Sequence, residues 1–155
     1  MENEYYCVFH TDSSSGDIDI ECRGEGQEIH FTMMIDYYSV PVLFFQLSRL
    51  WIGKTNETEM DGFGMTVDYY FKKEEDRLLI RHEVRSSDGD WVHHYNFDFA
   101  RFTIALDQGM KDLIAQERKL GNYPLPSSVY TDLLEEKNIK EYEAFSMLIR
   151  GDVTE

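Results

Sequence analysis

Apolar and polar residues alternate between Glu28 and Asp36, with Met34 as the one exception, and few folds accept that pattern. In an extended strand, one face would carry Ile29, Phe31, Met33 and Ile35, and the other Glu28, His30, Thr32 and Asp36. Glu4–Thr11 and Asp17–Arg23 have a similar strand-like character, and clusters of Asp, Ser and Gly separate the segments. We therefore predict a three-stranded antiparallel meander, with its third strand over Glu28–Tyr38, buried on one face only.

A nearly continuous apolar run, Pro41–Ile52, follows these strands. Pro41 suits a first helical turn and Gly53 a helix end, so we predict a buried helix. The polar segment Thr55–Gly62 is predicted to be a loop. In the second half we predict strands at Phe63–Lys72, Leu78–Arg85 and Trp91–Phe99, and helices at Arg101–Leu120, from Ser127 or Ser128 to Lys137, and at Lys140–Arg150.

The turn between the last two strands predicts a register. Asp88-Gly89 suits the two central positions of a type I′ turn. Such a turn sets Ile80 opposite Phe97, His82 opposite Tyr95 and Val84 opposite His93 on one face, and Glu83 opposite His94 and Leu79 opposite Asp98 on the other.

Length and composition agree with one packed domain. The chain has 155 residues, of which 42% are hydrophobic and 14% aromatic, too many for a disordered acidic chain. The predicted fold class is α+β: a single domain over residues 1–155, with a largely antiparallel sheet of about six strands in βββα-βββα order. A buried helix and C-terminal helices would pack on this sheet.

Several classes of protein are disfavoured. The N-terminus lacks the features of a signal peptide and no apolar run reaches the roughly 20 residues of a bilayer span, so we expect a cytoplasmic protein without membrane contact. Cys7 and Cys22 fit no metal-binding spacing, and we expect both to be buried, reduced thiols, with a disulfide as the less favoured alternative. Phosphate-binding loops and nucleophile motifs are absent, so we expect no cofactor and no covalent catalysis.

Negative charge is concentrated in the first half of the chain. Residues 1–71 hold thirteen Asp and Glu against three basic residues, and the whole chain has a formal net charge of −15. Such a field attracts cationic partners and repels nucleic acid. A basic protein partner is the expected ligand, and the sequence does not indicate the oligomeric state.

The predicted partner-binding residues form three groups. They are a ladder on one strand (Asp17, Asp19, Glu21), an acidic loop (Glu57, Glu59, Asp61) and tyrosine anchors (Tyr37, Tyr38, Tyr70). A plain solvated strand face is the main alternative for the ladder. A metal ion there is less favoured, because no further ligand pattern accompanies it. Docking through these groups requires that the carboxylates gather into one outward-facing patch.

A second group of residues supports a different function. His82, Trp91, His93 and Tyr95 fall on the face predicted to be the core. There, a buried histidine with one hydrogen-bond partner is the favoured interpretation. Should that face open, the four side chains would line a small-ligand pocket. A third alternative is an enzyme with His82 or His93 as its base, although no metal-ligand or catalytic spacing supports it.

In type, the chain resembles the small acidic immunity proteins that neutralise bacterial toxins. The resemblance consists of the small size, the acidity, the α+β pattern and the carboxylates and tyrosines named above, and it covers the whole chain loosely. It implies a bacterial, non-enzymatic inhibitor that docks a basic toxin. No motif here is diagnostic of one immunity family, so no contact residue is carried over from any of them.

Overall fold

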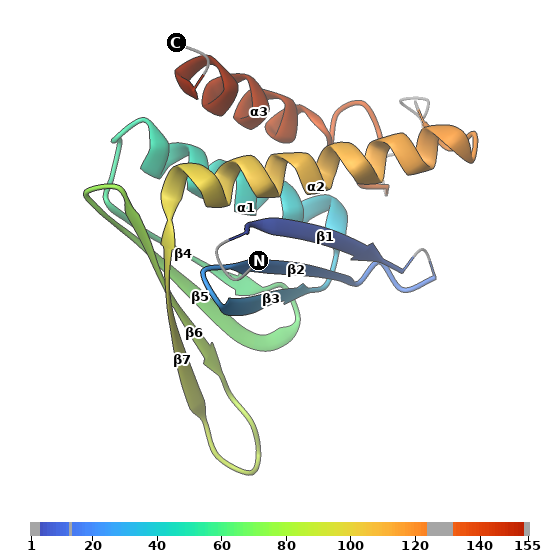
Figure 1. Ribbon diagram of the computed structural model, residues 1–155. Coiled ribbons are helices and arrows are strands. Elements are labelled where there is room, and N and C mark those ends of the chain that lie inside the picture. Colours follow the sequence, from blue (N-terminus) through green and yellow to red (C-terminus); the bar gives the residue numbers. More distant parts are fainter. Residues whose placement is uncertain (1–3, 13, 124–131, 154–155) are drawn as a thin grey trace.

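A computed structural model describes residues 4–12, 14–123 and 132–153 (Figure 1). The elements in chain order are β1 (Tyr6–Thr11), β2 (Ile18–Gly24), β3 (Gln27–Met33), α1 (Asp36–Trp51), β4 (Glu57–Gly62), β5 (Met65–Glu74), β6 (Arg77–Val84), β7 (Trp91–Asp98), α2 (Phe99–Lys119) and α3 (Lys140–Val153). They form two antiparallel sheets, β1-β2-β3 and β4-β5-β6-β7, with the helices layered on them. The α+β class and the antiparallel pairing are confirmed.

The three-stranded sheet has one buried and one polar face, as predicted. The apolar residues of its inner face are buried, and Ile20, Ile29 and Phe31 among them are fully buried. Helix α2 lies directly over β1, where a Cβ on Gly109 would come within 2.5 Å of the carbonyl oxygen of Cys7. A glycine is therefore required for this close approach of helix and strand. Cys7 and Cys22 are free, buried thiols directly opposite each other on β1 and β2, with their sulfurs 2.8 Å apart.

Helix α1 begins earlier than predicted. Ile35 adopts a left-handed backbone with φ of 53°, which ends the strand and turns the chain into the helix at Asp36. Pro41 consequently lies inside α1 instead of in its first turn. The prediction that Tyr37 and Tyr38 belong to a strand was wrong, because both stand in the first turn of α1 with their ring centroids 4.8 Å apart.

The segment predicted to be an acidic loop is strand β4. It pairs with β5 along its whole length, and its alternation places Met60 inward and Glu59 outward. Its three carboxylates in six residues give the segment a low strand propensity, which favoured the prediction of a loop. The backbone pairing with β5 overrides that local propensity. The helix predicted to run to Lys137 lies partly outside the described residues, and residues 132–139 form turns.

The register of the β6–β7 hairpin differs from the predicted one by two residues. Val84 pairs with Trp91 and His82 with His93, so His94 lies opposite Arg81 instead of Glu83. The turn centres on Ser87 and Asp88, because the N–H of Gly89 donates to the carbonyl oxygen of Ser86. Gly89 thus takes the last position of the turn, which glycine also favours. The two predicted faces are unchanged, because the shift is an even number of residues.

Strand β3 crosses the inner face of the four-stranded sheet and is bonded to it at three points. The side chain of Gln27 makes two hydrogen bonds to the backbone of Asn96 on β7. The hydroxyl of Tyr69 on β5 accepts from the N–H of Thr32 at 2.9 Å and donates to the carbonyl of His30 at 3.1 Å. The N–H of Met34 donates to the carbonyl of Gly62 after β4. Beyond this crossing, the β6–β7 hairpin projects away from the helices (Figure 1).

Candidate functional site

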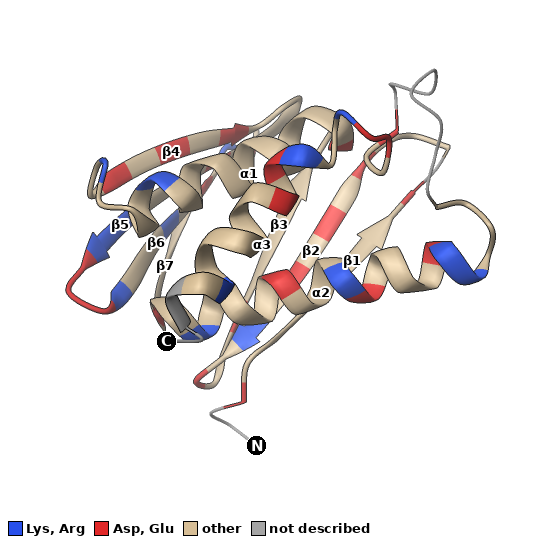
Figure 2. Cartoon of the chain, turned by 90° about the horizontal axis from the view of Figure 1, so that it is seen from above, with Lys and Arg blue, Asp and Glu red and all other residues tan. Residues whose placement is uncertain are grey.

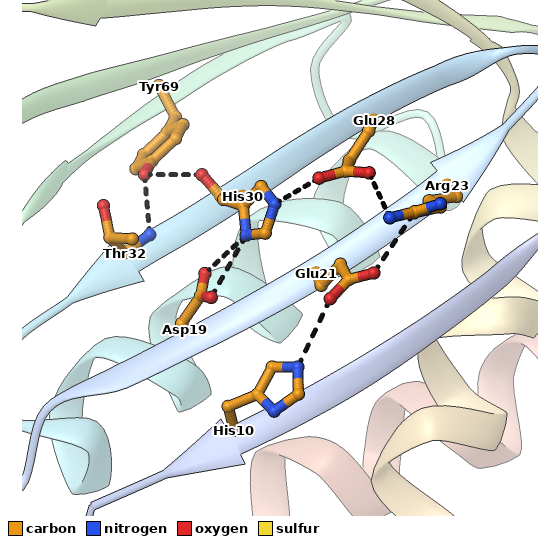
Figure 3. A network of polar contacts seen from close by, with 8 residues as sticks. All are labelled: His10, Asp19, Glu21, Arg23, Glu28, His30, Thr32 and Tyr69. Carbon is orange, nitrogen blue, oxygen red and sulfur yellow. Dashed lines mark hydrogen bonds and ion pairs between the residues drawn. The ribbon is translucent and has the colours of Figure 1, made fainter.

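The polar face of the three-stranded sheet carries a connected network, which we call the acidic face (Figure 3). Its members are Asp19, Glu21, Glu28, His10, Arg23 and His30. They lie side by side because the cross-strand pairs Glu21–His30 and Arg23–Glu28 share one side of the sheet. Three carboxylates therefore face outward together, with one arginine and two histidines among them.

His30 stands at the centre of the acidic face. Its Nδ1 lies 3.0 Å from Asp19 Oδ1, and its Nε2 lies 2.6 Å from Glu28 Oε2. Burial disfavours the charged ring, but the hydrogen bonds to Glu28 and Asp19 outweigh that effect and raise the pKa of His30. Hydrogen bonding to His30 in turn lowers the pKa of Glu28. When protonated, the ring can donate to both carboxylates at once.

A row of rings, which we call the aromatic wall, occupies the projecting part of the β6–β7 hairpin. It consists of His82, Trp91, His93 and Tyr95, the four residues predicted to form a core face or ligand pocket. The rings follow one another at centroid distances of 5.4 Å (His82–Trp91), 4.3 Å (Trp91–His93) and 6.4 Å (His93–Tyr95). Trp91 is 42% exposed and His93 is also exposed. The predicted burial of this face of β7 therefore holds at Phe97 but not at Trp91 and His93.

His82 is the buried member of the wall. Its ring stacks on Tyr69 at 4.6 Å, and its Nε2 has no hydrogen-bond partner among the described residues. Burial, with smaller contributions from His93 and His30, lowers the pKa of His82 to about 4. Ring contacts thus surround this histidine, and the expected hydrogen bond is not found at Nε2.

The acidic face and the aromatic wall adjoin each other along β3. Tyr69, on which His82 stacks, is bonded to the backbone of His30 and Thr32. Burial raises the pKa of the Tyr95 phenol, and the negative charge of the nearby Glu28 raises it further. One surface therefore combines carboxylates from the first half of the chain with exposed rings from the second half.

The remaining predicted partner-binding residues lie elsewhere. Asp17 belongs to the turn before β2, and Tyr37 and Tyr38 lie beside α3, where they share a shallow depression with Glu141. The other four lie on the outer face of the four-stranded sheet: Glu57, Glu59, Asp61 and Tyr70. The carboxylates of β2 and β4 are well separated (Figure 2). The expectation of a single acidic patch was wrong, because β4 belongs to a different sheet.

The outer face of the four-stranded sheet holds a hollow of about 680 Å³. Its polar lining includes Glu57, Glu59, Lys72, Arg81 and His94. The guanidinium of Arg81 lies 4.0 Å from the ring centroid of Tyr70 and its Nε 2.7 Å from Glu83 Oε2. Positive and negative groups thus alternate here, in contrast to the acidic face.

Metal chemistry finds no support in the part of the chain that the structure describes. No group of three or more His, Cys, Asp and Glu there is arranged to hold a metal ion. Likewise, none of the described helices is long and apolar enough to span a bilayer.

Five residues of the combined surface were missed at the sequence level: His10, Arg23, Glu28, His30 and Tyr69. The alternation of Glu28 and His30 with buried residues was visible, and it could have added both to the ladder of β2. Tyr69 carried no comparable signal, because its bond to β3 joins residues 37 and 39 positions apart.

Comparisons with known proteins add little to this picture. No family model matches the sequence, and no curated protein matches it. Among solved structures, the chain is similar to MRP1/MRP2 of Trypanosoma brucei, with 10% identity, a TM-score of 0.40, and coverage of 76% of this chain and 86% of that chain. A similarity at this level carries no argument about function, which therefore rests on the residues themselves.

Proposed function

We propose that this protein is a non-enzymatic binding protein that docks a basic protein partner on the acidic face and the aromatic wall. A toxin-neutralising immunity protein or a related inhibitor would act in this way. The observation that carries the proposal is the junction at Tyr69, which joins a carboxylate-rich sheet face to a row of exposed rings.

Charge supports the approach of such a partner. The net charge of −15 attracts a basic protein over a distance, and the side chains of Asp19 and Glu28 remain 37% and 39% exposed. Their partners on the acidic face are His30 for both carboxylates and Arg23 for Glu28, and these partner side chains are themselves 38% and 48% exposed. A cationic side chain of a partner can therefore compete for these carboxylates.

The rings support the stability of the complex once it forms. Tryptophan, tyrosine and arginine contribute most to binding energy at protein interfaces. An arginine of the partner could stack on Trp91 or Tyr95 while its guanidinium pairs with Glu28. The wall and the acidic face would thus recognise the flat and the charged parts of the same side chain.

The test uses two variants with equal charge changes on different faces. Asp19→Asn, Glu21→Gln and Glu28→Gln together neutralise the acidic face, whereas Glu57→Gln, Glu59→Gln and Asp61→Asn together neutralise β4. A partner is captured from the native cells, identified by mass spectrometry and purified, and its association rate is measured against salt concentration. We expect the first variant to associate about tenfold more slowly at low salt, and the second to associate nearly as fast as the wild type. Equal effects of both, or no effect of the first, would contradict the proposed docking face.

A small-ligand-binding module is a second candidate, and the hollow on the outer face of the four-stranded sheet favours it. Its volume of about 680 Å³ lies within the usual range of ligand sites. A metabolite present at a hundredfold its dissociation constant would add about 2.7 kcal/mol to the free energy of unfolding. Thermal denaturation with a metabolite library checks this candidate, and the stabilisation should be lost with Arg81→Ala.

A further inference from the structure

Strand β7 lies at the edge of the four-stranded sheet, and the described residues cover one end of that edge. The N–H and C=O of Asn96 point away from β6, because both bond to the side chain of Gln27, at 2.9 and 2.7 Å. The N–H of Asp98 also points outward and donates to Tyr5 and Glu25. These contacts end at Asn96.

The other end of the same edge has no hydrogen-bonded neighbour in the part of the chain that the structure describes. In a strand, alternate residues direct their backbone groups to the same side, so His94 and Val92 point outward as Asn96 does. No hydrogen bond between described residues uses the N–H or C=O of His94 or Val92, and both residues are exposed. A short open sheet edge therefore runs beside the aromatic wall.

We propose that an extended segment of the basic partner adds to this edge as a further strand, between Trp91 and Tyr95. The proposal rests on the proposed function and names how the partner binds. The backbone groups of His94 and Val92 would pair with the segment. Its alternate side chains would continue the row of Trp91, His93 and Tyr95 on one face, and the row of Val92 and His94 on the other.

Charge around the edge indicates a basic segment as the occupant. Asp88 and Asp90 lie in the connection between β6 and β7, at one end of the edge, and Glu28 lies near Tyr95 at the other. Nearby cations already have partners, since Arg77 pairs with Glu25 and Arg81 with Glu83. A second copy of this chain would bring another net charge of −15 to the same edge, so mutual repulsion disfavours pairing between copies.

Amide hydrogen exchange tests the proposal with a defined probe. The probe is an acetylated peptide of about nine residues in which arginine alternates with threonine, long enough for one strand. We expect the amides of Val92 and His94 to exchange about tenfold more slowly when the peptide is bound. The amides of His93 and Tyr95 point toward β6 and serve as internal controls that should change little. A peptide with glutamate in place of arginine should give no protection.

Two variants separate backbone pairing from side-chain contact. His94→Pro removes an outward N–H at an edge position where proline is tolerated, whereas His94→Ala keeps that N–H. We expect the proline variant to bind the peptide about tenfold more weakly than the alanine variant, since it loses a main-chain hydrogen bond. Circular dichroism and thermal unfolding check that both variants are folded.

The outcomes distinguish this inference from the proposed function. Equal binding by the two variants, or bound peptide without protection at His94, would overturn strand addition. Docking on the acidic face would survive that result if neutralising Asp19, Glu21 and Glu28 still slowed association with the captured partner. Protection of His94 that rises with protein concentration in the absence of peptide would show a second copy on the edge, and would also overturn the proposal.

Discussion

The two ends of strands β6 and β7 follow the same alternation but meet different surroundings. At one end Phe97 is fully buried and packs against Phe102 of α2, whereas at the other end Trp91, on the same face, is 42% exposed. The difference arises because β3 crosses the sheet at an angle (Figure 1). Along that crossing Gln27 of β3 bonds to Asn96 of β7, and Tyr69 of β5 bonds to His30 of β3. Alternation thus specifies which face of a strand is apolar, but a second layer specifies how much of that face is covered.

The largest effect is expected at the covered end. Phe97→Ala removes a fully buried ring that packs against Phe102 at 5.1 Å, and leaves a cavity. We expect the free energy of unfolding to fall by about 3–5 kcal/mol, measured by urea denaturation. A loss below about 1 kcal/mol would mean that this end is not the tightly packed one.

The crossing itself is tested by Tyr69→Phe. The change keeps the ring beside Phe31 and His82 but removes the hydroxyl that bonds to His30 and Thr32. Two backbone groups of β3 lose a partner, so we expect a loss of about 1–3 kcal/mol in the free energy of unfolding. If the crossing depended on ring packing alone, denaturation curves of this variant would coincide with those of the wild type.

At the boundary between the two ends, stability should depend on the charge of His82. Its pKa is lowered to about 4 in the folded protein, against an ordinary value of 6.5, so the unfolded chain binds more protons between these values. Stability from the neutral ring is therefore present above pH 6.5 and is lost as the pH falls toward 4. His82→Phe should abolish this loss, with a gain over the wild type that grows by about 1–2 kcal/mol between pH 7 and pH 5.

Asp36 changes stability in the opposite direction over a similar range. Burial, followed by the charges of Asp132 and Asp17, raises its pKa to about 6, so its protonation stabilises the fold as the pH falls. The comparison of His82→Phe with the wild type must therefore be made at each pH, where the contribution of Asp36 is common to both proteins. A difference between the two that does not change with pH would contradict the role given to His82.

The smallest effect on stability is expected at the projecting end. Trp91→Ala removes a ring that touches only His82 and His93 among the described rings, so we expect a loss below about 1 kcal/mol in the free energy of unfolding. The same variant should lose about 2 kcal/mol or more in affinity for the captured partner, because an exposed tryptophan is a typical interface anchor. Calorimetric titration measures the affinity, and a variant that is destabilised without losing affinity would assign Trp91 to the core.

Most of the local structure was predictable. The meander, the helix around Leu43 and Leu47, and the faces of β6 and β7 all follow from alternation and from apolar runs, which depend on neighbouring residues alone. Strand β4 was missed because its outward carboxylates resemble a loop, and the β6–β7 register because two adjacent turn positions, Ser87-Asp88 and Asp88-Gly89, both suit a tight turn.

The candidate site was predictable only in its parts. Asp17, Asp19 and Glu21 were expected to face outward together from one strand, which holds for Asp19 and Glu21 but not for Asp17, because Asp17 lies before β2. His82, Trp91, His93 and Tyr95 were expected to share one face, and this is confirmed. Their meeting along β3, and the separation of Glu57, Glu59 and Asp61 from them, follow from the division of the strands into two sheets. The alternation of side chains along a strand depends only on neighbouring residues. The angle between two sheets depends instead on contacts that join distant segments, such as the hydrogen bond from Tyr69 to His30. For that physical reason, the residue pattern specifies two outward-facing sets of side chains, and the folding of one sheet across the other makes them a single surface.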